Sequence, residues 1–195
     1  MNLTLKESLV TRSRVFSPWT AFYFLQSLLI NLGLGYPFSL LYTAAFTAIL
    51  LLLWRTLPRV QKVLVGISSL VAACYFPFAQ AYGAPNFNTL LALHSTNMEE
   101  STEILTIFPW YSYLVGIFIF VLGVIAIRRK KESEKARWNT FDSLCLVFSV
   151  ATFFVAPVQN LAWGGVFKLK DTGYPVFRFA KDVIVNNNEV IEEQE

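Results

Sequence analysis

The chain has 195 residues, of which 55% are hydrophobic and 16% aromatic, and its mean hydropathy is +0.49. A soluble domain of this length cannot hide so much apolar surface in one core, so the composition excludes an ordinary soluble protein and indicates an integral membrane protein. The formal net charge is +3, which we attribute to membrane topology, and we expect no nucleic-acid partner.

Five apolar windows predict membrane-spanning helices. Each is close to the roughly 20 residues that an α-helix needs to cross about 30 Å of hydrocarbon, and none shows the period-two alternation of a membrane β-barrel. Ser17 and Pro18 form a typical helix N-terminus at the start of the first window, which is also compatible with an uncleaved signal sequence. The predicted fold class is therefore an all-α membrane protein with five transmembrane helices, over residues 17–34, 38–57, 60–80, 110–127 and 140–161.

Basic residues flank these windows on one side. Because Lys and Arg near span ends are retained in the cytoplasm, we expect a cytoplasmic N-terminus and, after five crossings, a C-terminus outside. The basic run over residues 128–137 is explained by this topology, and a specific site for anionic lipid is the alternative interpretation. Of the 16 Lys and Arg residues, twelve lie on this side: Lys6, Arg12, Arg14, Arg55, Arg59, Lys62, Arg128, Arg129, Lys130, Lys131, Lys135 and Arg137.

The predicted spans contain few groups that transport would need. Asp142, near the start of the fifth window, is the only acidic residue inside them, and the sequence shows no internal repeat. Ion-coupled carriers usually bury charges along their path, so a transporter is disfavoured. Cys74 and Cys145 lie inside predicted spans, where we expect unpaired packing residues.

One segment predicted to face outside, residues 82–109, has no Lys or Arg and carries the stretch "HSTNMEESTEIL". After a "GAPN" turn its pattern predicts an amphipathic helix along the outer membrane interface, between the third and fourth spans. On that helix Thr96, Glu100 and Glu103 share one face, whereas Glu99 points elsewhere. His94 is expected to be a passive hydrogen-bond donor.

The last part of the chain, residues 166–195, is too polar to span a membrane and too short to form a core. Gly and Pro residues precede a stretch of mixed polarity, which indicates a linker along the surface. We therefore expect two parts, a five-span membrane domain over residues 1–165 and a linker toward a domain that this chain does not contain.

Together these features resemble the N-terminal membrane domain of the lipid A and lipopolysaccharide phosphoethanolamine transferases, the family that includes the mobile colistin-resistance enzymes. The resemblance rests on five spans, the loop motif "TNMEESTEIL" and the linker "YPVFRF". It implies a location in the bacterial inner membrane, phosphatidylethanolamine as donor and lipopolysaccharide as acceptor. It also implies a separate periplasmic catalytic domain with a threonine nucleophile and a zinc site. We expect no cofactor in this chain, and zinc in the absent domain.

The resemblance also implies candidate substrate-binding residues. The family places Asn, Thr and Glu at four-residue spacing on one face of the periplasmic helix, and Thr96 and Glu100 match the last two. The Asn position falls on Ala92, and Asn88 or Asn97 could serve instead. A carboxylate would attract the ethanolamine ammonium, and a hydroxyl would donate to the phosphate. The bland alternatives are a solvated helix face, or a non-enzymatic inner-membrane scaffold whose periplasmic loop contacts another protein.

Overall fold

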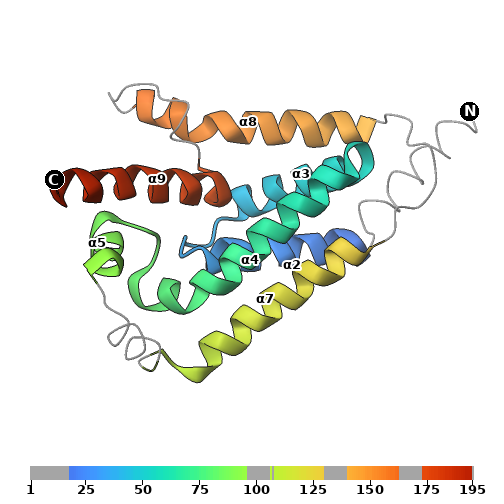
Figure 1. The fold of residues 1–195 in the computed structure, drawn as a ribbon. Helices are drawn as coiled ribbons and strands as arrows, with labels where there is room; N and C mark the ends of the chain where they lie inside the picture. Colours follow the sequence, from blue (N-terminus) through green and yellow to red (C-terminus); the bar gives the residue numbers. More distant parts are fainter. Residues whose placement is uncertain (1–17, 96–105, 107, 130–139, 163–172, 195) are drawn as a thin grey trace, which may run out of the picture.

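The fold is a bundle of α-helices (Figure 1). The computed structural model describes residues 18–95, 106, 108–129, 140–162 and 173–194, and no β-strand occurs among them. The prediction of an all-helical protein is confirmed for these residues. The helices are α2 (Pro18–Gly33), α3 (Leu40–Thr56), α4 (Pro58–Tyr82), α5 (Phe87–Ser95), α7 (Trp110–Arg128), α8 (Thr140–Ala162) and α9 (Pro175–Gln194).

Each predicted span coincides with a helix, namely α2, α3, α4, α7 or α8. Three helices are long and apolar enough to cross a membrane, over Pro58–Tyr82, Trp110–Arg128 and Thr140–Gln159. Helix α3 is apolar but has 17 residues, and α2 has 16. Length and composition therefore support at least three spans, and the number five stays a prediction.

The helices pack through small and polar residues. Helix α2 contacts α3, α4 and α7, while α8 packs on α3. Helices α4 and α7 approach closely at two glycines, because a Cβ on Gly116 would lie 2.6 Å from the Ala73 carbonyl oxygen and one on Gly123 would lie 2.6 Å from the Ser69 Cβ. Small residues at such contacts allow helix backbones to approach in membranes, where water does not drive association.

Buried amides join the helices across the interior. The Gln26 side chain donates to Ser69 Oγ at 2.7 Å, and the Asn31 side chain donates to Thr43 Oγ1 at 3.1 Å. Both amide residues are buried. Because hydrocarbon offers no alternative partner, these bonds fix how α2 faces its neighbours.

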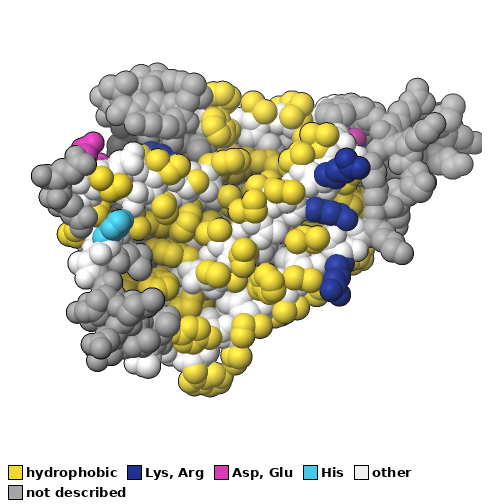
Figure 2. All heavy atoms as spheres, viewed as in Figure 1, with side chains coloured by type: hydrophobic (Ala, Val, Ile, Leu, Met, Phe, Trp, Pro, Cys, Tyr) yellow, Lys and Arg dark blue, Asp and Glu magenta, His cyan; other side chains and the backbone are white. Residues whose placement is uncertain are grey.

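Five of the seven Lys and Arg residues that the structure describes lie at one end of the bundle, which we call the basic end (Figure 2). Helices α3 and α7 end there and α4 and α8 begin there (Figure 1). A single residue, Leu57, separates α3 from α4, and Pro58 begins the next helix. The segregation predicted from sequence is thus present among the described residues, of which Arg55, Arg59, Lys62, Arg128 and Arg129 form the basic end.

Helix α5 follows the predicted turn. Gly83 has a φ of +72°, and the Asn86 side chain caps α5 by accepting from the Thr89 backbone N–H at 3.0 Å and from its hydroxyl at 3.1 Å. The described part of this helix has nine residues and ends at Ser95. The predicted amphipathic helix, which extends beyond that residue, therefore stays a prediction. Cys74 and Cys145 are both free, but only Cys145 is buried.

Candidate functional site

The substrate-binding residues predicted from sequence, Thr96 and Glu100, lie outside the described residues, as does Asn97. Their assignment stays a prediction. Asn88 is exposed on α5, and His94 near the end of α5 approaches Asn187 of α9, with 3.2 Å between Nε2 and Oδ1. The structure does describe α5, which ends at Ser95, and the neighbouring helix α9. Both lie at the end of the bundle opposite the basic end (Figure 1).

Helix α9 starts from a buried anchor. The side chain of Tyr174 is 1% exposed, and its hydroxyl donates to the Ser149 carbonyl of α8 at 2.8 Å. Gly173 precedes it against Tyr42, whose Cζ would lie 2.0 Å from a Cβ at residue 173. Burial raises the pKa of Tyr174 to about 12, so its hydroxyl stays protonated and donates at neutral pH. Pro175 then begins α9 with its φ already suited to a helix.

From this anchor α9 runs alongside α5 and α2. The Phe179 ring meets the Tyr75 ring edge-on, with centroids 5.0 Å apart, and Val190 is fully buried. Within the segment predicted to be a surface linker, Pro175–Gln194 is therefore a helix with one packed face. Because α9 is packed in this way, the positions of its polar residues relative to the bundle are fixed.

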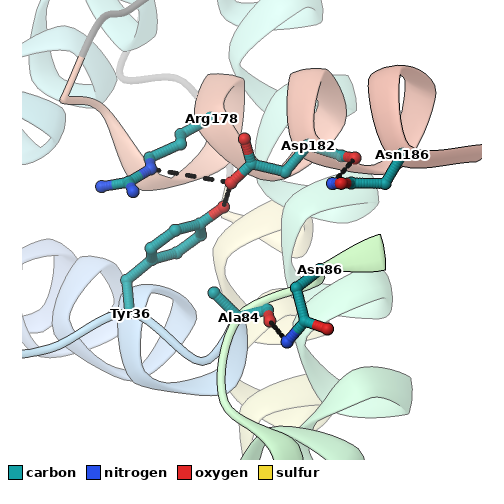
Figure 3. A network of polar contacts seen from close by, with 6 residues as sticks. All are labelled: Tyr36, Ala84, Asn86, Arg178, Asp182 and Asn186. Carbon is teal, nitrogen blue, oxygen red and sulfur yellow. Dashed lines mark hydrogen bonds and ion pairs between the residues drawn. The ribbon is translucent and has the colours of Figure 1, made fainter. Parts of the chain in front are cut away.

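The main polar contact of α9 is what we call the docking junction, formed by Tyr36, Arg178 and Asp182 (Figure 3). The Tyr36 hydroxyl donates to Asp182 Oδ2 at 2.7 Å, and Arg178 Nε lies 3.6 Å from the same oxygen. The Arg178 guanidinium carbon also lies 5.2 Å from the centre of the Tyr36 ring. The junction joins α9 to the connection between α2 and α3.

The charges in the junction are unequally exposed. The Arg178 side chain is 55% exposed and that of Asp182 is 20% exposed. Burial raises the pKa of Tyr36 well above its usual value, and the hydrogen bond to Asp182 and its negative charge add to the rise. Tyr36 is therefore a donor at all physiological pH values, and the arginine keeps N–H groups that face outward.

Two glycines allow the loop that carries Tyr36 to pack closely against the loop between α4 and α5. Gly35 has a φ of +80°, and a Cβ there would lie 2.4 Å from the carbonyl carbon and oxygen of Gly83. The Tyr75 hydroxyl donates to that same carbonyl oxygen at 2.9 Å, and Asn86 donates to the Ala84 carbonyl at 3.5 Å (Figure 3). The two connecting loops therefore cross with no room for a side chain between them.

The charged groups of the docking junction are suited to binding a zwitterion. A guanidinium and a carboxylate side by side complement a zwitterion, since one attracts a phosphate and the other an ammonium. Among the described residues, no three His, Cys, Asp or Glu side chains are grouped so that they would hold a metal ion.

Sequence reasoning missed the junction. Tyr36 resembles an interfacial anchor such as Trp110, because aromatic residues collect at span ends. A usable signal was the four-residue spacing of Arg178 and Asp182 in a mostly apolar stretch, which places opposite charges on one helix face. No local signal indicates that Tyr36 meets them.

Comparison with known proteins identifies the relationship. The chain is 98% identical over all 195 residues to the phosphoethanolamine transferase OpgE of Escherichia coli strain K12. It matches the N-terminal membrane region of a phosphoethanolamine transferase. The resemblance to phosphoethanolamine transferases is thereby confirmed, whereas lipid A and lipopolysaccharide as substrates stay predictions. No protein-family model and no solved structure matches the chain. The chain spans 37% of the length of OpgE, so the activity, substrates and partners of the whole protein are proposed rather than shown.

Proposed function

We propose that this chain anchors a phosphoethanolamine transferase in the bacterial inner membrane and forms part of its binding site for the lipid donor, phosphatidylethanolamine. Near-identity to a protein of that name over the whole chain is the observation that carries the proposal. The apolar helices are consistent with the anchoring role. In this proposal, zinc and the catalytic nucleophile belong to a periplasmic domain, and this chain supplies lipid contacts.

The end with the docking junction is proposed to face the periplasm. Five of the seven described Lys and Arg residues lie at the opposite end, against Arg178 and Lys181 of α9 at this one, and the positive-inside rule assigns the more basic end to the cytoplasm. The donor's head group would then lie level with α5 and α9. The bilayer itself is a partner of the exposed apolar residues on α4, α7 and α8.

The proposed head-group contacts come from two neighbouring sources. Thr96 and Glu100 follow Ser95, the last residue of α5, and α5 packs beside α9. Arg178 adds exposed N–H donors for the phosphate, while Glu100 supplies a carboxylate for the ammonium. The junction thus orients one half of a site whose other half was predicted from sequence.

The test is transfer of phosphoethanolamine by the full-length protein, from labelled phosphatidylethanolamine to lipopolysaccharide. We expect Thr96→Ala and Glu100→Ala each to reduce transfer about tenfold, the effect of one lost charge-assisted hydrogen bond, with insertion and abundance unchanged. The matched control is Glu99→Ala, which we expect to stay within about twofold of the wild type because helical spacing predicts that its side chain points away from the shared face.

A second pair of variants addresses Arg178. Arg178→Lys keeps the positive charge but loses the planar fork, whereas Arg178→Gln loses both, so transfer should fall in that order. Equal transfer in all these variants would refute the head-group site and favour a scaffold role. Transfer to another periplasmic glycan in place of lipopolysaccharide would replace the acceptor that the resemblance implies.

A further inference from the structure

Arg129, at the basic end, is enclosed by aromatic rings. It follows the last residue of α7, and its guanidinium carbon lies 3.7 Å from the centre of the Trp54 ring, 4.1 Å from that of Trp19 and 5.8 Å from that of Tyr23. The rings come from α2 and α3, so three helices converge on one cation. Aromatic faces hold a guanidinium in place but do not neutralise its charge.

Two buried hydrogen-bond donors belong to this cluster, Arg129 Nη1 and Trp54 Nε1. Neither has a hydrogen-bond partner among the residues that the structure describes. A buried donor without an acceptor costs free energy, and a charged donor costs more than a neutral one. Native structures rarely leave such groups unpaired, so two in stacking contact indicate that an acceptor binds between or beside them.

The surroundings determine which acceptor fits. Five basic residues form the basic end, and Asp142 is the acidic residue that the structure describes there. Asp142 already pairs with Arg55 at 2.5 Å. The local charge is therefore strongly positive and favours an anion. Neighbouring exposed apolar residues on α4 and α7, among them Val63 and Ile125, place the cluster next to lipid.

We propose that Arg129 and Trp54 bind the phosphate of an anionic phospholipid at the basic end. The planar fork of an arginine fits two phosphate oxygens, and an indole N–H at the membrane interface supplies a further donor. Anionic lipids are the phosphates that a cytoplasmic leaflet presents to basic residues. A specific site for anionic lipid was the alternative interpretation of the basic run over residues 128–137. The proposal places that site at Arg129. It does not depend on the transferase activity.

The test uses the full-length protein in neutral detergent, titrated with phosphatidylglycerol, with phosphatidylcholine or with inorganic phosphate. Tryptophan fluorescence reports binding, and the thermal unfolding midpoint reports stabilisation. We expect saturable binding and a raised midpoint with phosphatidylglycerol, and much smaller changes with the other two. Arg129→Gln should weaken phosphatidylglycerol binding about tenfold or more. The matched control, Arg128→Gln, removes the same charge from the exposed neighbouring residue and should stay within about twofold of the wild type.

Two further variants keep the test decisive if Arg129→Gln does not fold. Trp54→Phe keeps an aromatic face but removes the N–H, and Arg129→Lys keeps the charge but removes the fork, so each should weaken binding severalfold. Equal losses in Arg128→Gln and Arg129→Gln would overturn the site, because they would indicate unspecific charge attraction. An equal response to inorganic phosphate would overturn the assignment to a lipid.

Discussion

The hydroxyl of Tyr36 and the carboxylate of Asp182 are separated by 146 positions in the sequence and by 2.7 Å in the structure. This bond joins the connection after α2 to the middle of α9. Because Arg178 reaches the same carboxylate oxygen, one hydrogen bond also orients the exposed guanidinium. The position of α9 relative to the bundle therefore depends on a side chain that belongs to the first helical hairpin.

Removing the Tyr36 hydroxyl should loosen α9. Tyr36→Phe keeps the buried ring but loses a hydrogen bond to a charged acceptor, which we expect to lower the stability of the docked helix by about 1.5–3 kcal/mol. Hydrogen exchange of the α9 amides would measure this as faster exchange from Arg178 onward. Tyr82→Phe, at an exposed tyrosine, is the control and should leave exchange unchanged. Equal protection of α9 in wild type and Tyr36→Phe would contradict a docking role.

The same tyrosine predicts an alkaline dependence of stability. The pKa of Tyr36 is raised in the folded state from its usual value of 10.0, so the folded chain holds this proton more tightly than the unfolded chain. Its contribution to stability is complete below pH 10 and is lost as the pH rises from 10 toward the raised value. The midpoint advantage of the wild type over Tyr36→Phe should thus be constant below pH 10 and shrink above it. A constant difference across that range would exclude a raised pKa.

The glycine crossing predicts two different losses. Gly83→Ala introduces a side chain at positive φ with no atom within 4 Å, so we expect only the conformational cost of about 1–3 kcal/mol. Gly35→Ala also places a side chain at positive φ and in addition forces a Cβ into the Gly83 carbonyl group, which should add about 1–3 kcal/mol. Thermal unfolding of the two variants compares them directly. Equal midpoints would show that the loops do not cross as closely as described.

The ion pair at the basic end should matter for the packing of α8 on α3. Arg55 and Asp142 have side chains that are 16% and 4% exposed, so Asp142→Asn leaves a mostly buried cation with a weaker partner. We expect a loss of about 2–4 kcal/mol in unfolding free energy. Glu189→Gln, at an exposed acidic residue of α9, is the control and should change stability by less than about 0.5 kcal/mol. A similar small change for Asp142→Asn would mean that the pair is not a structural contact.

The positions of the helices could be predicted closely from the sequence. The window over residues 110–127 corresponds to Trp110–Arg128, and the window over residues 17–34 corresponds to Pro18–Gly33. Long apolar runs bounded by Pro and by charged residues determine where a membrane helix begins and ends, so this information is local. The basic end was predicted for the same reason.

The sites formed by distant residues could not be predicted. Trp19 and Trp54 each fit the pattern of interfacial anchors, and only the rotation of α2 and α3 about their axes brings both to Arg129. Likewise Tyr36 has no sequence feature that points to Asp182. Such contacts depend on helix packing, which small residues such as Gly123 decide across the bundle rather than along the chain.

The proposed periplasmic site requires the two ends of the bundle to face opposite sides of the membrane, which cysteine labelling measures directly. Cysteines introduced at the exposed positions Asn188 and Arg59, in a full-length protein with Cys74 and Cys145 replaced, would be treated with a membrane-impermeant maleimide on spheroplasts. We predict that Asn188→Cys is labelled at once and that Arg59→Cys is labelled only after the membrane is permeabilised. Labelling in the opposite order would place α9 and the docking junction in the cytoplasm and contradict the proposed binding of a periplasmic head group.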